Sequence, residues 1–182
     1  HSTDGTSEII KSFGKRITIV RPSFHLRMSA NWNYAIRSSS KEWILPFSGD
    51  DKLSPSCLIN LFSKKGLLSD VILLMGATAR NDLMTGKITK RAIRSVPAYS
   101  DSDLLLKKLI CTPLCSFGSF CFLRSSFEAV GGFDESFHLI HDWVFQLKLC
   151  ALGGFLKTDS VVIEKPVNQD RPELEDKRIP LY

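Results

Sequence analysis

Apolar residues along the chain fall into short blocks of two kinds, separated by polar turns. Continuous β-branched or aliphatic runs predict buried strands, because a strand covered on both faces has no polar side. Apolar residues three and four positions apart predict helices that bury one face. The strands predicted in this way cover residues 17–20, 43–47, 71–77, 117–123 and 161–163. Met84-Thr85-Gly86-Lys87 predicts a hairpin turn that leads into Ile88.

Helices are predicted between these strands from apolar spacing and from residues that are typical of helix ends. Ser54 followed by Pro55 is typical of a helix start, and Gly131 with Gly132 is typical of a helix end. The predicted helices cover residues 6–13, 29–37, 54–65, 101–110, 127–130 and 141–152. The side chains expected to share the buried face of the last helix are Trp143, Val144, Leu147 and Ala151.

The alternation of strands and helices predicts an α/β fold with a mainly parallel, Rossmann-like sheet flanked by helices. The chain has 182 residues, a usual length for a single domain. Ligands of such sheets bind at the carboxyl ends of the strands. Asp50 and Asp51 directly follow a predicted strand, so we expect them where a ligand would bind.

Composition narrows the class of protein only a little. The 43% hydrophobic and 24% charged residues are ordinary for a globular protein and argue against a disordered or coiled-coil chain. No apolar run reaches the roughly 18 residues that a membrane-spanning helix needs. The net charge of +5 suits an anionic ligand or an acidic membrane face. The basic residues are scattered and lack aromatic neighbours, so no nucleic-acid partner is expected.

The five cysteines and the polar start of the chain, which lacks the features of a signal peptide, favour the reducing cytoplasm. Cys111, Cys115 and Cys121 could in principle bind zinc, with His138 or His141 as the fourth ligand. Their spacing matches no common zinc module, and they lie among apolar residues, where free cysteine is typically part of the core.

The first acidic stretch is Gly49-Asp50-Asp51, in a turn between a predicted strand and a predicted helix. Adjacent carboxylates repel each other, and a divalent cation between them and a phosphate would remove that repulsion. Oxygen ligands without neighbouring cysteine or histidine favour Mg²⁺ or Mn²⁺ over zinc. An ordinary acidic surface turn would have the same sequence, so both interpretations stand.

The second acidic stretch runs from Gly131 to Glu135 and is followed by His141-Asp142. Asp142 lies in the first turn of a predicted helix, where the helix dipole favours the ionised carboxylate by about 0.3–1 kcal/mol. An ionised carboxylate beside a substrate hydroxyl can accept its proton as a general base. The alternative is an ordinary acid at a helix start.

In this order and spacing, these stretches resemble the family 2 glycosyltransferases, which have the nucleotide-sugar-binding GT-A fold. Residues 43–51 resemble the family's strand and Asp-x-Asp motif, and residues 127–135 closely resemble its acceptor-side signature. His141-Asp142 resembles its Glu-Asp pair. Residues 2–7 look like the loop after the family's second strand, and residues 32–36 look like its helix before the metal strand.

The resemblance implies a role for each matching residue. Asp142 would be the catalytic base of an inverting displacement at the anomeric carbon. Asp50 and Asp51 would bind Mn²⁺ or Mg²⁺, which would neutralise charge on the leaving diphosphate. The residues expected to bind the nucleotide sugar are Asp4, Asn33 and Asp50. Those expected on the acceptor side are Gly118, Arg124, Asp134 and His141.

The resemblance also implies a domain organisation, substrates and a cellular setting. Residues 1–100 would form the nucleotide-sugar and metal half of one catalytic domain, residues 101–167 the acceptor half, and the charged residues 168–182 an extended tail. The expected partners are a nucleotide-sugar donor, first of all a UDP-sugar, and a saccharide or lipid-linked acceptor. The expected setting is bacterial surface-polysaccharide assembly in the cytoplasm, with peripheral association with the inner face of the membrane left open.

Three departures from the family pattern keep a second hypothesis open. Ser48 replaces the first acid of the Asp-x-Asp motif, and His141 replaces the glutamate of the Glu-Asp pair. The family's first strand and helix have no counterpart in this sequence, so we expect an N-terminally incomplete GT-A domain. The alternative function is therefore a truncated or degenerate, non-catalytic binding module.

Overall fold

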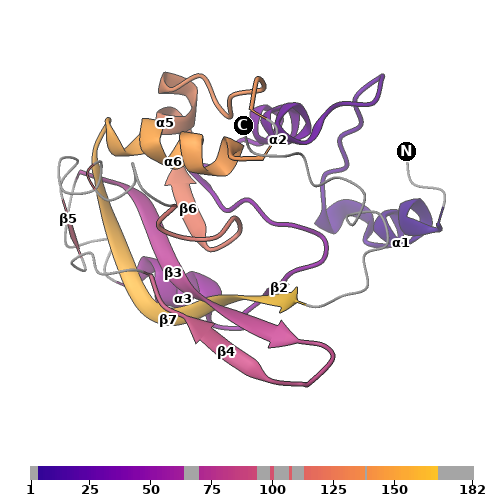
Figure 1. Ribbon diagram of the computed structural model, residues 1–182. Coiled ribbons are helices and arrows are strands. Elements are labelled where there is room, and N and C mark those ends of the chain that lie inside the picture. The colour runs from indigo at the N-terminus through magenta and orange to yellow at the C-terminus, as the bar shows by residue number, and fades with distance from the viewer. Residues whose placement is uncertain are drawn as a thin grey trace, which may run out of the picture.

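The strands of the chain form one mixed sheet with helices on both faces (Figure 1). The computed structural model describes residues 4–63, 70–93, 99–100, 107, 113–137 and 139–167. The strands are β1 (Trp43–Ile44), β2 (Lys52–Leu53), β3 (Val71–Asp82), β4 (Ile88–Arg91), β5 (Tyr99–Ser100), β6 (Phe120–Leu123) and β7 (Gly154–Val167). The helices are α1 (Thr6–Ser12), the 3-10 helix η1 (Gly14–Arg16), α2 (Met28–Arg37), α3 (Cys57–Phe62), α5 (Arg124–Ala129) and α6 (His141–Cys150).

The prediction of an α/β sheet is confirmed, but the prediction that it is mainly parallel is wrong. The strand order is β1-β6-β3-β7-β2, with β4 beside β3 and β5 beside β7. Among the described strands only β3 and β7 pair in parallel, from Val71 opposite Gly154 to Asp82 opposite Val167. The other five pairings are antiparallel. The hydrophobic pattern of the sequence does not indicate strand direction. A strand buried on both faces has the same continuous apolar pattern in a parallel and in an antiparallel pairing.

Alternate side chains of the central strands enter two separate cores. Leu73 and Met75 of β3 point to a phenylalanine-rich core beneath α2, α5 and α6, whereas Leu74 points to a smaller core beneath α3. The larger core includes Phe120, Phe122, Phe127, Phe133, Phe145 and Phe155. Burial on both faces explains why β3 and β6 read as continuous apolar runs.

The hairpin between β3 and β4 was predicted from its turn residues and is confirmed. Gly86 has φ 68°, a conformation that glycine adopts without strain. Asp82 Oδ1 accepts hydrogen bonds from the N–H groups of Met84 and Thr85 at 3.0 and 3.1 Å. The helices predicted near 29–37 and 141–152 are confirmed as α2 and α6.

The predicted buried strand at 17–20 is wrong. These residues are not part of any described strand, and Ile17 and Ile19 are 41% and 43% exposed. A β-branched run forms a strand only where a neighbour accepts its backbone hydrogen bonds, and no described strand pairs with it. The last strand is much longer than predicted, because β7 runs along the whole of β3. The helix predicted at 101–110 lies outside the described residues, except for Lys107.

The buried face of α6 also differs from the prediction. Its buried residues are His141, Phe145, Gln146, Leu149 and Cys150. Ala151 is exposed, and Trp143 and Leu147 pack only at the margin of the core. In the described part of the chain, no helix combines the length and the apolar character needed to span a membrane.

Candidate functional site

A tight turn at the carboxyl end of β1 carries the first pair of predicted site residues. The Asp51 N–H donates to Ser48 O at 3.2 Å, which closes the turn. Asp50 is exposed, whereas the Asp51 side chain is only 3% exposed. The two neighbouring carboxylates therefore stand in different environments, one in solvent and one inside the protein.

Lys165 neutralises the buried carboxylate of Asp51. Its Nζ lies 2.5 Å from Asp51 Oδ2, and it reaches the turn from the carboxyl end of β7. A buried carboxylate without a partner would be costly, so this ion pair is what allows Asp51 to lie inside. Sequence reasoning missed Lys165 because the predicted strand ended at Ile163. A lysine two residues after the predicted strand, at the edge of the sheet that carries an acidic turn, was the available signal.

Gly118 packs against the same carboxylate. It has φ 85°, and a Cβ at this position would lie 3.4 Å from Asp51 Oδ2 and 2.5 Å from Ile163 Cδ1. A larger residue here would be strained and would collide with Ile163. The structure thus places Gly118 beside Asp51, and its predicted role on the acceptor side stays a prediction.

A row of aromatic rings in contact connects the Asp50 turn to the second predicted site, at the start of α6. Phe117, next to Gly118, stacks on Trp32 of α2 with ring centroids 3.9 Å apart and an angle of 15° between the planes. Trp32 in turn meets the His141 ring edge-on at 4.7 Å. His141 is 5% exposed, and its Nδ1 has no hydrogen-bond partner among the described residues.

Asp142 stands beside His141 at the start of α6, as predicted. It is half-buried, and its Oδ1 accepts a hydrogen bond from the Trp143 N–H at 2.9 Å. Burial raises the pKa of the neighbouring Cys115 thiol, and the negative charge of Asp142 adds to that rise. Cys115 is therefore a neutral thiol at pH 7.

The Asn33 side chain forms hydrogen bonds within the protein. Its Nδ2 donates to Phe133 O at 2.8 Å and to Glu135 Oε1 at 2.9 Å, while its Oδ1 accepts from the Phe133 N–H at 2.8 Å. The residue is 2% exposed, and a Cβ on Gly132 would lie 2.7 Å from its Oδ1. These contacts make Asn33 a residue that positions the loop before α6. Its predicted contact with the nucleotide sugar stays a prediction.

Arg124 caps the end of α2. Its Nη1 donates to Ile36 O at 3.1 Å and also to Ser39 O, its Nη2 donates to Arg37 O at 3.3 Å, and its Nε pairs with Glu128 at 2.9 Å. The carboxyl end of a helix has carbonyl groups without intrahelical partners, and a guanidinium can satisfy them. These contacts give Arg124 a capping role, and its place on the acceptor side stays a prediction.

The two remaining predicted acids lie in exposed turns. Asp134 accepts hydrogen bonds from the Ser136 hydroxyl at 2.6 Å and from its N–H at 3.1 Å, and Lys148 Nζ lies 3.3 Å away. These Ser136 hydrogen bonds, with Lys148, lower the pKa of Asp134. Asp4 accepts from the Thr6 hydroxyl at 2.5 Å, and this bond lowers its pKa. Asp4 and Asn33 are not brought to the Asp50 turn by any contact that the structure describes.

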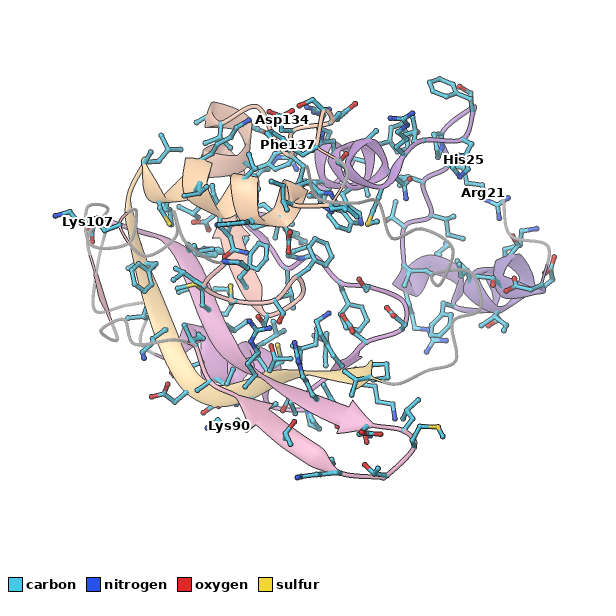
Figure 2. All side chains as sticks on the ribbon, viewed as in Figure 1. Arg21, His25, Lys90, Lys107, Asp134 and Phe137 are labelled. Carbon is cyan, nitrogen blue, oxygen red and sulfur yellow. The ribbon has the colours of Figure 1, made fainter. Side chains whose placement is uncertain are left out.

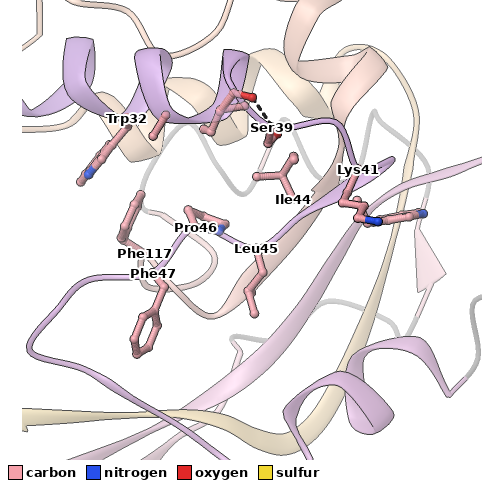
Figure 3. A pocket seen from close by; sticks show the side chains of 11 residues that line it. Trp32, Ser39, Lys41, Ile44, Leu45, Pro46, Phe47 and Phe117 are labelled. Carbon is pink, nitrogen blue, oxygen red and sulfur yellow. Dashed lines mark hydrogen bonds between the residues drawn. The ribbon is translucent and has the colours of Figure 1, made fainter. Parts of the chain in front are cut away.

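An apolar pocket of about 370 Å³ lies between α2 and residues 43–47, directly before the turn (Figure 3). Among the described residues that line it, Lys41 is the charged one, and the others are mainly aromatic and aliphatic. The lining suits an apolar group and offers little to a diphosphate. β1 pairs with β6 on one edge, and no described strand lies on its other edge.

The acidic turn offers few ligands to a divalent cation. Among the described residues, no group of three or more histidine, cysteine, aspartate or glutamate side chains could hold a metal ion. Asp51 Oδ2 is already paired with Lys165, so Asp50 is the carboxylate that faces solvent. Mg²⁺ commonly binds to one or two carboxylates together with substrate phosphates. The turn fits this mode, in which phosphate oxygens complete the site.

Comparison with known proteins decides the family. The model of the family described as "Glycosyl transferase family 2" matches residues 1–131, which is more than half of the chain. The chain belongs to glycosyl transferase family 2. The family membership expected from the resemblance is thereby confirmed. His141 and Asp142 lie beyond the matched residues, so their roles gain no direct support from the match.

A solved structure supports the GT-A type α/β fold of this family 2 glycosyltransferase. The crystal structure of S. aureus TarS 1-349 has a TM-score of 0.69 and 12% sequence identity, and the alignment covers 91% of this chain. It covers 49% of the TarS chain, so the present chain spans about half the length of that structure. At this identity the likeness shows the fold alone. No curated protein matches the sequence.

Proposed function

We propose that this chain transfers a sugar from a nucleotide-sugar donor to an acceptor hydroxyl with inversion at the anomeric carbon. The observation that carries the proposal is the connection of the acidic turn to the start of α6. Gly118 lies against Asp51, Phe117 stacks on Trp32, and Trp32 contacts His141. One segment, residues 117–118, thus joins the turn proposed for the diphosphate to the helix start proposed for the base.

In the proposed mechanism, Asp142 accepts the proton of the acceptor hydroxyl. The acceptor oxygen forms a bond to the anomeric carbon as the bond from that carbon to the diphosphate oxygen breaks. The diphosphate leaves with the electron pair of the broken bond, and the proton remains on Asp142. Asp50 would hold Mn²⁺ or Mg²⁺, which when bound supplies positive charge to the leaving diphosphate.

The substrate classes proposed here are those that the family resemblance implies. A UDP-sugar is the proposed donor, and a saccharide or lipid-linked saccharide is the proposed acceptor, in bacterial surface-polysaccharide assembly. The net charge of +5 supports an anionic donor. The proposed location is the cytoplasm, where nucleotide sugars would be available to the chain.

Substitution of the proposed base tests this function. We expect Asp142→Asn to lower the transfer rate by about 10²-fold to 10⁴-fold, because the amide cannot accept the proton. The affinity for nucleoside diphosphate with Mn²⁺ should stay nearly unchanged, since the substitution preserves size and the hydrogen bond described for Asp142 is to Trp143, not to the Asp50 turn. Release of nucleotide from a panel of nucleotide sugars measures transfer, and calorimetric titration measures binding.

A matched control is Asp159→Asn, because Asp159 is an exposed aspartate whose side chain is 71% exposed. This variant should transfer sugar at the wild-type rate. Equal loss of binding and transfer in Asp142→Asn would contradict the role of Asp142. Wild-type protein that neither transfers sugar nor binds a nucleoside diphosphate with Mn²⁺ would favour the second function below.

The second function is that of a non-catalytic binding module. The edge of β1 that pairs with no described strand, and the apolar pocket beside it, favour this alternative. An exposed strand edge can take up an extended segment through backbone hydrogen bonds. Micromolar, metal-dependent binding of nucleoside diphosphates would argue against a purely structural role of this kind.

Peripheral membrane association is a further part of the proposed setting. The N-terminal arm, residues 4–27, includes α1, which buries none of its residues. Its exposed apolar side chains are Ile9, Phe13, Ile17, Ile19 and Phe24. The arm has five lysines and arginines and two acids, a net charge of +3. Apolar and basic side chains on one exposed segment are typical of binding to an anionic membrane surface.

A further inference from the structure

The imidazole of His141 is buried next to the proposed base, and one of its nitrogens is unpaired. The residue is 5% exposed, and no group in the described part of the chain forms a hydrogen bond with its Nδ1. Buried polar atoms in folded proteins are almost always hydrogen-bonded. An unpaired nitrogen at the start of α6 therefore points to a partner that comes from outside the chain.

We propose that His141 is an acceptor-binding residue, whose Nδ1 forms a hydrogen bond with a second hydroxyl of the same acceptor molecule that Asp142 deprotonates. The inference rests on the proposed function, because it concerns the acceptor of that glycosyl transfer. It goes further by assigning one atom of the chain to one kind of group on the acceptor.

The first argument is the position of His141 in the chain. His141 is the first residue of α6, and Asp142 is the second. The Cα atoms of consecutive residues lie about 3.8 Å apart, so one small molecule can contact both side chains. An acceptor that presents a hydroxyl to Asp142 therefore brings its neighbouring groups close to His141.

The second argument is that the ring of His141 packs in an aromatic cluster. It meets the Trp32 ring at 4.7 Å, and Trp32 in turn contacts Phe117 at 3.9 Å and Phe133 at 5.3 Å. A phenylalanine would pack among these rings without burying an unpaired nitrogen. Packing alone therefore does not explain a histidine here. A residue that breaks a local rule of stability in this way is typical of a functional site.

The third argument is the kind of group that fits Nδ1. In a neutral imidazole one ring nitrogen carries a proton and donates, whereas the other accepts. A hydroxyl can donate to Nδ1 or accept from it, so it fits either tautomer. Hydroxyls are also the groups that a saccharide carries in number, which makes a second hydroxyl of the acceptor the natural partner.

An acceptor reaches Nδ1 only after a neighbouring side chain moves, because the atom is buried. The two residues directly before His141 are Leu139 and Ile140, which are 76% and 41% exposed. These side chains bury little apolar surface, so a displacement costs little. Hydrogen bonds in binding sites often form fully only in the complex with substrate.

The test compares variants of His141 in steady-state transfer. The probes are UDP-sugars and the methyl glycosides of glucose, galactose, mannose and N-acetylglucosamine, and the pair that the wild type uses fastest is taken. We expect His141→Phe to raise the KM for the methyl glycoside about tenfold and to leave the KM for the UDP-sugar unchanged. His141→Leu is smaller and should behave in the same way. His141→Asn keeps a polar atom near the place of Nδ1 and should stay within about threefold of the wild type.

Monodeoxy analogues of the methyl glycoside identify the hydroxyl that Nδ1 binds. One analogue should raise the KM of the wild type about tenfold but raise that of His141→Phe no further, because the hydrogen bond is already lost. The matched control is His25→Phe, an exposed histidine on the N-terminal arm (Figure 2), which should leave both KM values unchanged. An unchanged acceptor KM in folded His141→Phe or His141→Leu, or the lack of any coupled analogue, would overturn the proposal. A merely structural role of His141 would give that result.

A binding measurement separates this inference from the proposed function. The imidazole nitrogen NMR signals of His141, identified by their loss in His141→Phe, should shift when the same methyl glycosides are added without donor. A shift without any transfer would support the inference and contradict the proposed function. Transfer without a shift and without a change in the acceptor KM would contradict the inference alone. Neither a shift nor transfer would contradict both.

Discussion

Asn33 and Arg124 show how polar residues that suggest ligand binding are used within the fold. All three hydrogen bonds described for the Asn33 amide go to residues 133–135, a hundred residues further along the chain. Arg124 directs its guanidinium at the carbonyl groups that end α2. Both residues therefore hold α2 to the segments around β6 and α6, and they act on the site through its geometry.

Removal of the Asn33 amide tests this role at the scale of one residue. Asn33→Ala leaves the buried Phe133 N–H without its partner, which costs about 1–3 kcal/mol of unfolding free energy. The matched control is Asn31→Ala, an exposed asparagine on the same helix, which should change stability by less than about 0.5 kcal/mol. Urea denaturation measures both. Similar stability of the two variants would contradict the positioning role.

At the scale of elements, the loop between α5 and α6 decides where Asp142 stands. Gly131 and Gly132 have φ 79° and 83°, so the chain turns sharply after α5. Phe133 then enters the core, with its ring 4.2 Å from that of Phe145 of α6. Asp134 ties the loop to α6 through Lys148 at 3.3 Å. The loop is thus fixed to α6 at Phe145 and at Lys148, and it leads into the helix start that carries Asp142.

The Asp134 contacts predict a pH-dependent contribution to stability. The hydrogen bonds from Ser136, with Lys148, lower the pKa of Asp134 in the folded protein, so they stabilise its ionised form. Their contribution is fully present above the ordinary aspartate pKa of about 3.9, and it is lost as the pH falls through the lowered folded value. Asp134→Asn should therefore be less stable than the wild type at pH 7, and this difference should vanish in acid.

Urea midpoints between pH 2 and pH 7 measure this effect. Ser136→Ala should remove more of the pH dependence than Lys148→Met, because the serine hydrogen bonds are the larger cause of the lowered pKa. A difference between wild type and Asp134→Asn that persists unchanged at pH 2 would show that the carboxylate charge does not stabilise this loop.

At the scale of the whole molecule, the N-terminal arm stands apart from the sheet and its two cores. Figure 1 shows α1 to one side of the sheet, and Figure 2 shows Arg21 and His25 on the same arm, away from β4 and its Lys90. Arg21 Nη2 bonds Ser7 Oγ at 2.7 Å, so the arm makes contacts within itself. Its exposed apolar and basic side chains are the basis for the proposed membrane association.

Flotation with lipid vesicles tests the role of the arm. We expect the chain to bind vesicles that contain phosphatidylglycerol, to bind phosphatidylcholine vesicles poorly, and to be released by salt. Lys11→Gln with Lys15→Gln should weaken binding on the order of tenfold or more, at about 1 kcal/mol for each lysine. Lys87→Gln with Lys90→Gln removes the same charge from the hairpin and should have little effect. Equal loss in both double variants would contradict a specific role of the arm.

The sequence by itself determined the elements whose signals are local. Continuous apolar runs predicted β3 and β6, the turn residues predicted the β3–β4 hairpin, and helical spacing predicted α2 and α6. The order of the acidic turn, the Gly-Gly-Phe-Asp-Glu stretch and the following acid indicated the family. Such signals can be recognised from the sequence alone because they depend on backbone propensity and on residues that are neighbours in the chain.

Only the tertiary structure decided the direction of the strands, whether residues 17–20 form a strand, and which partners the polar site residues have. Each depends on segments far apart in sequence: β7 alongside β3, Lys165 on Asp51, and Phe133 on Asn33. A buried charge or amide is stabilised by whichever partner the fold brings to it, and local sequence does not specify that partner. For this reason Asp50 and Asp51 look equivalent in the motif, while the fold places one in solvent and pairs the other with Lys165.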